Sequence, residues 1–299
     1  MPAILIALVL SLGQRALAVE DIALDAQLQA LVASHQGKVA VYATDVRSGR
    51  TASIDAHTAV PTASVIKLVI LFEALKQVQE GGVKLTDALT LRADNQVEGS
   101  GVLGLFDTPL QLTLKDALTM MIVVSDNTAT NLVIDYLGLE NIDRRIAWMG
   151  LHDTWLYKKV FKPVSGVVPA DQKKFGLGKT TAQEMAEVMQ HFATCNLNAQ
   201  NSTAKPSAQD QTLCDAALQM LKNQTDRDSI PRYLGDITIA NKTGALDEVR
   251  NDVAIAYARN GPVIVSEFTY DNKDQRWTSD NAAQVLMARL AKTIVDRWN

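Results

Sequence analysis

Ser64 and Lys67 are the first residues of the chain whose types and spacing suggest chemistry. They lie three positions apart, so a helix would place both side chains on one face. The run from Val65 to Phe72 is apolar apart from Lys67, and a helix of that composition is buried. Burial lowers the lysine pKa, which makes Lys67 a usable base beside a hydroxyl. The pattern predicts an activated serine nucleophile, although a serine at a helix start is most often only a cap.

Two tripeptides further along the chain could complete such a site. S-D-N begins at Ser125, between two helical stretches, and K-T-G begins at Lys242, on a predicted strand. S-x-x-K alone is weak because it arises readily by chance, but a chance match to all three motifs in this order is rare. The three motifs therefore predict one catalytic constellation.

With these motifs in this order, the sequence resembles the class A β-lactamases and penicillin-binding serine hydrolases over nearly its whole mature length. The stretches MMIVVSDNTATNLVIDYLG and NKTGALDEVRNDVAIAY resemble the class A branch in particular. The resemblance implies an acyl-enzyme mechanism without a cofactor. The implied partner is a small-molecule β-lactam or a cell-wall peptide.

The resemblance also implies a role for each reacting group. Ser64 would attack the β-lactam amide, and Lys67 would be its activating partner. Ser125 would pass a proton to the leaving nitrogen. The backbone N–H groups of Ser64 and Ala245 would form the oxyanion hole, which stabilises the negative charge of the tetrahedral intermediate.

Other residues would hold the substrate, according to the same resemblance. Asn127 would hydrogen-bond the amide of the substrate's side chain. Lys242 and Thr243 would bind the substrate carboxylate, and Arg250 could add positive charge there. Asp126 is expected to tie its loop together and not to react.

The sequence departs from the family at the step that releases the product. Class A enzymes carry a glutamate after S-D-N that activates the deacylating water, but the chain has no Glu between Glu140 and Glu184. Our alignment places Val160 at that position. The loop carboxylates are Asp153 and Asp171, and Asp171, although out of register, is the alternative base. We therefore expect acylation to be intact and deacylation to be slow.

Three functions are compatible with this pattern. We favour β-lactam hydrolysis through an acyl-enzyme at Ser64. The alternatives are a penicillin-binding D-Ala-D-Ala peptidase and a β-lactam or muropeptide sensor that is acylated but hardly turns over. The loop is also basic, and its lysines either form a solvated face or a rim that attracts anionic substrates. These loop lysines are Lys158, Lys159, Lys162, Lys173, Lys174 and Lys179.

The composition of the chain argues against several other classes of protein. The 299 residues are 47% apolar and 21% charged with a net charge of −4, which favours a folded globular protein over a disordered one. An acidic chain argues against general nucleic-acid binding. The four histidines are far apart and neither cysteine lies in a ligand cluster, so we expect no metal. We expect a monomer.

The first 18 residues differ from the rest of the chain. Residues 3–10 form an apolar run too short to span a bilayer, and Ala16-Leu17-Ala18 matches a signal peptidase site. No Lys or Arg precedes the run, so the signal is atypical or the true start lies upstream. The alternative is an apolar helix packed on the domain. We expect export, to the periplasm or the medium, and no membrane anchor.

Cys195 and Cys214 are the two cysteines of the chain. They flank a stretch rich in Asn, Gln, Ser and Thr that is typical of a polar surface loop. In an oxidising compartment such a pair can close the loop as a disulfide. The alternative is two free thiols.

The elements that must position these residues are strands near both chain ends and helices between them. We expect strands at 38–46, 51–54, 237–242, 252–258 and 262–269, and helices at 23–34, 64–79, 114–124, 127–137, 142–149, 181–195, 213–224 and 279–298. This order predicts an α/β fold: a five-stranded antiparallel sheet built from both chain ends and flanked by terminal helices, with an inserted all-α domain. The expected boundaries are 1–18 for the signal peptide, 19–62 and 226–299 for the sheet domain, and 63–225 for the helical domain.

Overall fold

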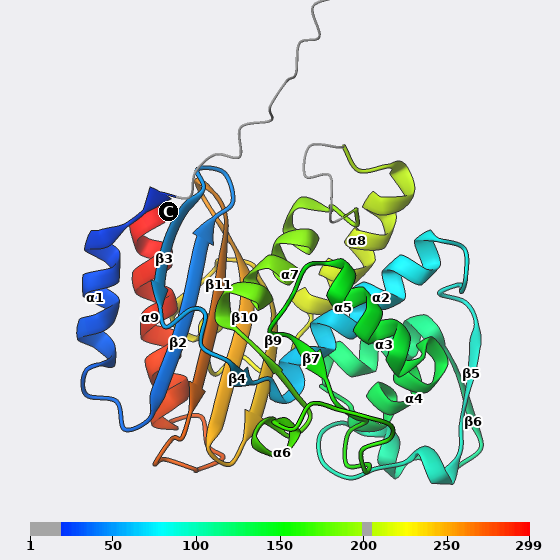
Figure 1. The fold of residues 1–299 in the computed structure, drawn as a ribbon. Helices are drawn as coiled ribbons and strands as arrows, with labels where there is room; N and C mark the ends of the chain where they lie inside the picture. The colour runs from blue at the N-terminus through cyan, green and yellow to red at the C-terminus, as the bar shows by residue number, and fades with distance from the viewer. Residues whose placement is uncertain (1–18, 199–204) are drawn as a thin grey trace, which may run out of the picture.

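The main sheet is built from both ends of the chain, as expected. The structure is a computed structural model that describes residues 19–198 and 205–299, so the expected signal peptide lies outside the described residues (Figure 1). The strand order is β1-β3-β2-β11-β10-β9. These strands are β1 (Val19–Glu20), β2 (Lys38–Asp45), β3 (Arg50–Ile54), β9 (Ile239–Leu246), β10 (Val249–Ala258) and β11 (Gly261–Tyr270).

The prediction of five antiparallel strands is correct for the larger strands but misses β1. This two-residue strand pairs parallel with β3, through Val19 opposite Arg50. A strand of two residues has no alternation that a sequence pattern could reveal. The sheet therefore has six strands: the five longer ones pair antiparallel with one another, and β1 pairs parallel with β3.

Two terminal helices cover one face of this sheet (Figure 1). They are α1 (Ile22–Val32) and α9 (Ala282–Trp298). Leu24 and Leu28 of α1 and Leu290 and Ile294 of α9 are fully buried in one core with the sheet residues of that face. Their spacing of four residues forms the apolar stripe that such a helix turns toward a sheet.

The inserted segment is mostly helical, but the prediction of an all-α domain is wrong. It contains β5 (Ala88–Leu91) paired with β6 (Leu110–Thr113), and β7 (Trp155–Leu156) paired with β8 (Gly178–Thr180). Strand β8 also pairs with β4 (Val60–Pro61), which lies just before this segment. The larger helices are α2 (Lys67–Gln79), α3 (Leu114–Val123), α4 (Asn127–Leu137), α5 (Leu139–Trp148), α7 (Ala182–Thr194) and α8 (Ala208–Lys222). The short ones are α6 (Gln172–Phe175) and the 3-10 turns η1 (Ala63–Ile66), η2 (Ala93–Asn95), η3 (Leu103–Leu105) and η4 (Ile230–Tyr233).

Helix α2 runs through the centre of this part of the molecule. Every residue from Leu68 to Leu75 is buried, and all are apolar except Glu73, which forms an ion pair with Arg145. A helix whose whole circumference is packed has little freedom to shift. It therefore gives the residues at its start a fixed position.

The disulfide between Cys195 and Cys214 is confirmed, with a Cα–Cα distance of 5.6 Å. It joins the end of α7 to α8. The expected polar loop is shorter than predicted, because α8 begins at Ala208 and not at 213. Ser207 caps α8 by accepting a hydrogen bond from the Asp210 backbone N–H, so this polar sequence is a helix start that resembles a loop in composition.

Candidate active site

Ser64 lies in a 3-10 turn, and Lys67 is the first residue of α2. The expected continuous helix over 64–79 is therefore wrong in its first turn. Thr62 is the N-cap of η1, so Ser64 is not a capping residue. Ala63, directly before it, has a φ of 43°. Backbone in this left-handed region is uncommon for a residue other than glycine and is found disproportionately at functional sites.

Strand β9 packs directly on the turn that carries Ser64. A Cβ atom at Gly244 would lie 2.9 Å from the Ser64 backbone nitrogen and 3.0 Å from that of Val65. Only glycine allows this approach, which gives the third position of K-T-G a physical reason. The contact brings Lys242, Thr243 and Ala245 on β9 next to Ser64.

The S-D-N motif forms the connection between α3 and α4. Asp126 is 1% exposed, and its carboxylate accepts hydrogen bonds from the backbone N–H groups of Val102 (2.6 Å), Leu103 (2.8 Å) and Ala129 (2.8 Å). These bonds cap α4 and tie the segment at 102–103 to it. Asp126 is thus a structural residue, and it fixes the backbone on both sides of itself.

Ser125 is held between two lysines. The Lys67 Nζ donates to the Ser125 carbonyl (2.7 Å), to its Oγ (3.1 Å) and to Asn127 Oδ1 (3.1 Å). The Lys242 Nζ donates to the same Oγ at 3.0 Å and to the Thr243 carbonyl at 2.7 Å. The structure therefore brings residues of all three motifs together around one hydroxyl.

The pKa values of Lys67 and Lys242 are both lowered. Both are fully buried. Burial, together with the positive charge of Lys242, holds the pKa of Lys67 well below its usual value. Burial lowers the pKa of Lys242 to about 8, and the negative charges of Asp226 and Asp252 oppose that shift. A neutral Lys67 is a base, and a charged Lys242 is an anion-binding group.

A pocket of about 180 Å³ opens beside this cluster. It is lined by Ser64, Ser125, Thr243 and Ala245 and by residues that carry no motif, among them Asp226 and Trp277. The sequence reasoning missed these last two because their nearness to Ser64 depends on tertiary packing. The pocket holds a hydroxyl beside a buried amine and the backbone of two elements, which suits acyl transfer.

Arg250 lines an adjoining pocket of about 200 Å³, together with Thr243, Ala245 and Trp277. Its side chain is 3% exposed, and its guanidinium donates to the carbonyls of Val249 and Arg276, each at 2.8 Å. A carbonyl of the β9–β10 turn, that of Leu246, is a further acceptor. Arg250 therefore shares a pocket with Thr243, with much of its hydrogen-bonding capacity used by the backbone.

Val160 is buried in a loop that is fixed to α4. Its backbone N–H donates to Asn131 Oδ1 (2.8 Å), and its carbonyl accepts from Asn131 Nδ2 (2.9 Å). Asn131 lies one turn after Asn127 on the same helix, a spacing that could have identified it. The aligned position of the family glutamate thus carries an apolar side chain on a well-held backbone.

Asp171 is engaged elsewhere as a structural carboxylate. Its oxygens accept from the Tyr157 hydroxyl (2.7 Å) and the Lys179 ammonium (2.8 Å). These bonds, first that from Lys179, lower the pKa of Asp171. A carboxylate stabilised in its charged form is a weak base, which argues against Asp171 as a substitute for the glutamate.

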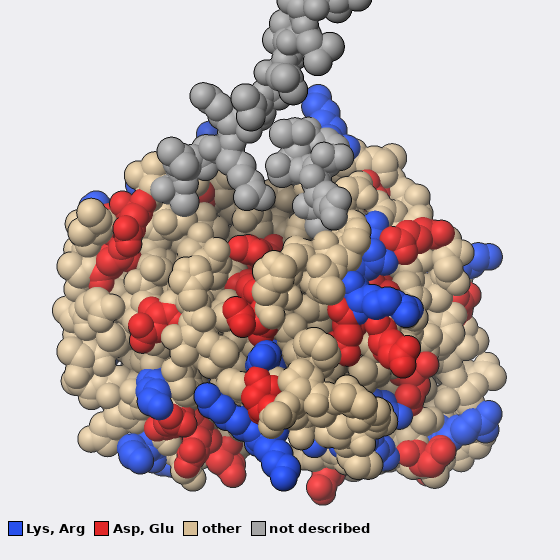
Figure 2. Space-filling view, viewed as in Figure 1, with Lys and Arg blue, Asp and Glu red and all other residues tan. Residues whose placement is uncertain are grey.

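The basic loop is partly neutralised. Lys159 forms an ion pair with Asp135 at 2.7 Å, Lys179 pairs with Asp171, and Lys162 donates to the carbonyl of Asp94. On the face shown in Figure 2, lysine and arginine side chains are interspersed with acidic ones. This arrangement favours the solvated face over an anion-attracting rim.

The fold and the cluster around Ser125 together define a serine hydrolase of the β-lactamase type. The model of the beta-lactamase enzyme family matches residues 23–298, so the chain belongs to that family.

Solved structures agree with this assignment. A beta-lactamase from Sphaerobacter thermophilus DSM 20745 is 28% identical with a TM-score of 0.77, over 92% of this chain and 96% of that chain. PBP-A is 24% identical with a TM-score of 0.77, over 93% and 96%. A beta-lactamase from Chitinophaga pinensis DSM 2588 is 17% identical with a TM-score of 0.76, over 93% and 100%. The latter two support the fold alone. In the described part of the chain, no helix is long and apolar enough to cross a membrane.

Proposed function

We propose that this protein is an acyl-enzyme of the class A type, which β-lactams acylate at Ser64 and which hydrolyses the resulting ester slowly. The observation that carries the proposal is the Ser125 hydroxyl, held within 3.1 Å of both Lys67 and Lys242 beside the pocket that Ser64 lines. In this proposal Lys67 is the base, Ser125 the proton carrier and Lys242 the cation that assist Ser64 as the nucleophile.

Acylation would proceed with these groups in turn. The Ser64 Oγ attacks the lactam carbonyl carbon and gives its proton to the neutral amine of Lys67. The N–H groups of Ser64 and Ala245 hold the oxyanion. When the carbon–nitrogen bond breaks, the nitrogen takes a proton from the Ser125 Oγ, which regains one from Lys67. Lys242 and Thr243 bind the substrate carboxylate, and Asn127 binds the side-chain amide.

Deacylation would be slow because the position of the water-activating base is apolar. Val160 supplies no proton acceptor from its side chain, and Asp171 is tied to Tyr157 and Lys179. General base catalysis contributes roughly 100- to 10,000-fold, so its loss makes this step limiting. The same feature supports the second candidate, a penicillin-binding D-Ala-D-Ala peptidase or a sensor, because a serine that lacks a water-activating base would keep the acyl group that it takes from a β-lactam.

Intact-mass spectrometry during turnover of a penicillin tests the proposal. Penicillin G is a suitable probe, since a point mutant of the structurally similar PBP-A is known as its acyl-enzyme complex. We expect an adduct on Ser64 that decays while substrate is consumed. An adduct with peptidase activity on a D-Ala-D-Ala peptide would favour the peptidase, and a permanent adduct with neither activity would favour the sensor. The absence of any adduct together with the absence of substrate loss would refute all three.

Export is part of the same proposal. The disulfide between Cys195 and Cys214 is of the kind that persists in oxidising compartments. The apolar run at 3–10 and the small residues before position 19 fit a cleaved signal. Mass analysis of the protein recovered from the periplasm or the medium should show a chain that begins near Val19. A cytoplasmic chain of full length would refute it.

A further inference from the structure

Trp277 is a large aromatic residue at the mouth of the site, and the mechanism above does not use it. It lies in the segment between β11 and α9 and is 65% exposed. It lines both the pocket of Ser64 and the adjoining pocket of Arg250. We propose that Trp277 is a specificity-determining residue, whose ring stacks on a planar aromatic substituent next to the substrate carboxylate. The proposal rests on the proposed function and adds a substrate preference to it.

The ring of Trp277 is held from two sides. The Arg250 guanidinium lies 4.5 Å from the ring centre, a distance at which a cation is attracted to the face of an indole. The indole Nε1 donates to Asp247 Oδ1 at 3.2 Å. A ring fixed in this way loses little conformational entropy when a ligand stacks on it. The indole therefore offers a fixed and exposed aromatic face on which a ligand can stack.

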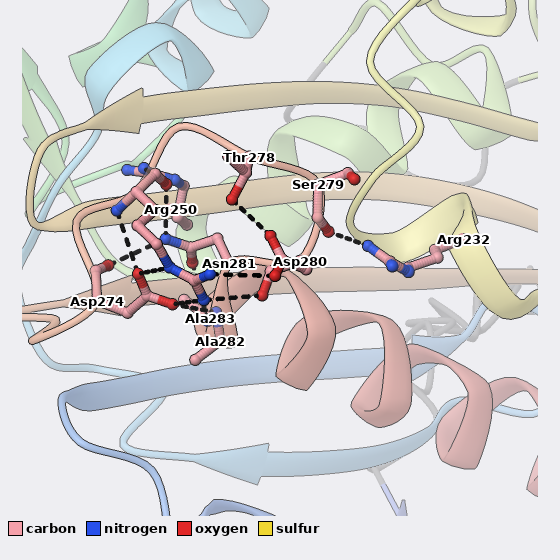
Figure 3. A network of polar contacts seen from close by, with 10 residues as sticks. Arg232, Arg250, Asp274, Thr278, Ser279, Asp280, Asn281, Ala282 and Ala283 are labelled. Carbon is pink, nitrogen blue, oxygen red and sulfur yellow. Dashed lines mark hydrogen bonds and ion pairs between the residues drawn. The ribbon is translucent and has the colours of Figure 1, made fainter.

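The segment that carries Trp277 is held by a network of hydrogen bonds and ion pairs (Figure 3). The Asn281 amide donates to the carbonyls of Asp274 (3.0 Å) and Arg276 (2.9 Å), and Asp274 accepts from the Ala282 backbone at 2.8 Å. Arg276 pairs with Asp274 at 2.8 Å and with Asp280 at 3.0 Å. Bonds on both sides of position 277 thus fix the backbone of the tryptophan.

The location of the ring determines which part of a substrate it would contact. Trp277 shares both pockets with Thr243, which is proposed to bind the carboxylate, whereas Asn127, proposed to bind the opposite end, lines neither pocket. In cephalosporins the ring carbon next to the carboxylate-bearing carbon carries the variable substituent. A planar aromatic group at that position offers a face to the indole, and a methyl group does not.

Two cephalosporins with the same acyl side chain test the proposal, one with a planar aromatic substituent at that carbon and one with a methyl group. The second-order rate constant for acylation of Ser64 is measured for both, by mass spectrometry. In Trp277→Ala, the constant for the aromatic compound should fall roughly 2- to 12-fold, the range that an aromatic contact provides. The methyl compound should change less than about twofold. Trp277→Phe keeps a ring and should retain most of the preference.

The controls separate a contact with substrate from support of Arg250. Phe106→Ala removes an exposed aromatic residue that lines neither pocket, and it should leave both constants unchanged. An equal loss for both compounds in Trp277→Ala would mean that Trp277 merely supports its surroundings, and unchanged constants would mean that it does not touch the substrate. Either result overturns the inference while the proposed function stands. A wild-type protein that neither compound acylates would overturn the proposed function first.

Discussion

The cluster around Ser125 and the loop around Val160 are both fixed to α4 by buried polar side chains, but they offer different chemistry. In the cluster, Asp126 holds three backbone N–H groups, and Lys67 and Lys242 present titratable groups to one hydroxyl. In the loop, Asn131 holds the N–H and the carbonyl of Val160, and the side chain between them is apolar.

The difference shows that rigidity and reactivity are set by separate residues. The backbone at Val160 is paired at both its polar atoms although its side chain cannot take a proton. The loop can therefore be held firmly without a side chain at position 160 that acts as a base. The backbone of a glutamate at position 160 would be held in place by Asn131.

The largest effect should follow from removal of the nucleophile. Ser64→Ala should abolish covalent labelling by a penicillin, because no other group would form the ester. The fold should stay intact, since the turn that carries Ser64 has no side-chain capping hydrogen bond to lose. Intact-mass spectrometry measures the labelling, and circular dichroism checks the fold. Labelling that survives in Ser64→Ala would refute the assignment of the nucleophile.

The second prediction addresses the loop. The wild-type protein should give a burst of one product equivalent per enzyme, followed by a slower steady state. Val160→Glu should speed the second phase, with the roughly 100- to 10,000-fold of general base catalysis as the upper range. Stopped-flow absorbance with a chromogenic β-lactam measures both phases.

Val160→Gln is the matched control, because it has nearly the size of glutamate without its basicity. It should leave the steady state close to that of the wild type. A wild-type time course that is linear, with no detectable adduct, would contradict the interpretation, because another group would then activate the water efficiently.

The third prediction uses the shifted pKa values of the cluster. Lys67 must be neutral to accept a proton, so acylation should slow as the pH falls below its lowered pKa. Lys242 must be charged to bind a carboxylate, so acylation should also slow as the pH rises through about 8. Each limb should approach about tenfold per pH unit.

Lys242→Arg is the variant that tests the alkaline limb. Arginine stays charged over this range, so the fall near pH 8 should disappear even if the overall rate drops. The measurement is the acylation rate constant between pH 5 and 10. An alkaline limb that persists unchanged in Lys242→Arg would assign it to another group.

The motif residues were predictable because their chemistry is encoded in residue types at short spacing. Ser64 and Lys67 lie on one turn, and the apolar run around Lys67 indicates its burial without reference to the rest of the chain. The five longer strands were also predictable from local sequence, as short runs rich in strand-forming residues between turns. The spacing of Asn131 from Asn127 points to the same helix face, but the contact of Asn131 with Val160, 29 positions away, is tertiary. The contact of Trp277 with Arg250, 27 positions away, is tertiary as well, and no local pattern encodes it.

The errors of the fold prediction also arise where structure depends on tertiary contacts or where one local sequence suits two structures. Strand β1 has two residues and takes its identity from β3. The start of α8 is polar because Ser207 and Asp210 satisfy its free N–H groups, and a polar sequence of that kind is also typical of a loop. The turn at Ser64 departs from a regular helix where β9 packs on it at Gly244, a tertiary contact.

The smallest expected effect concerns Asn131, which joins the loop around Val160 to α4 and thereby to the cluster around Ser125. Asn131→Ala would leave the buried N–H and carbonyl of Val160 without their partner, which should lower the free energy of unfolding by about 1–3 kcal/mol. Denaturant unfolding measures this change. Acylation of Ser64 should be nearly unaffected, because Lys67 and Ser125 keep their bonds. In the background of Val160→Glu, however, Asn131→Ala should remove much of the gain in deacylation, since the carboxylate would lose its fixed backbone. Equal gains with and without Asn131 would show that the loop holds its position by other contacts.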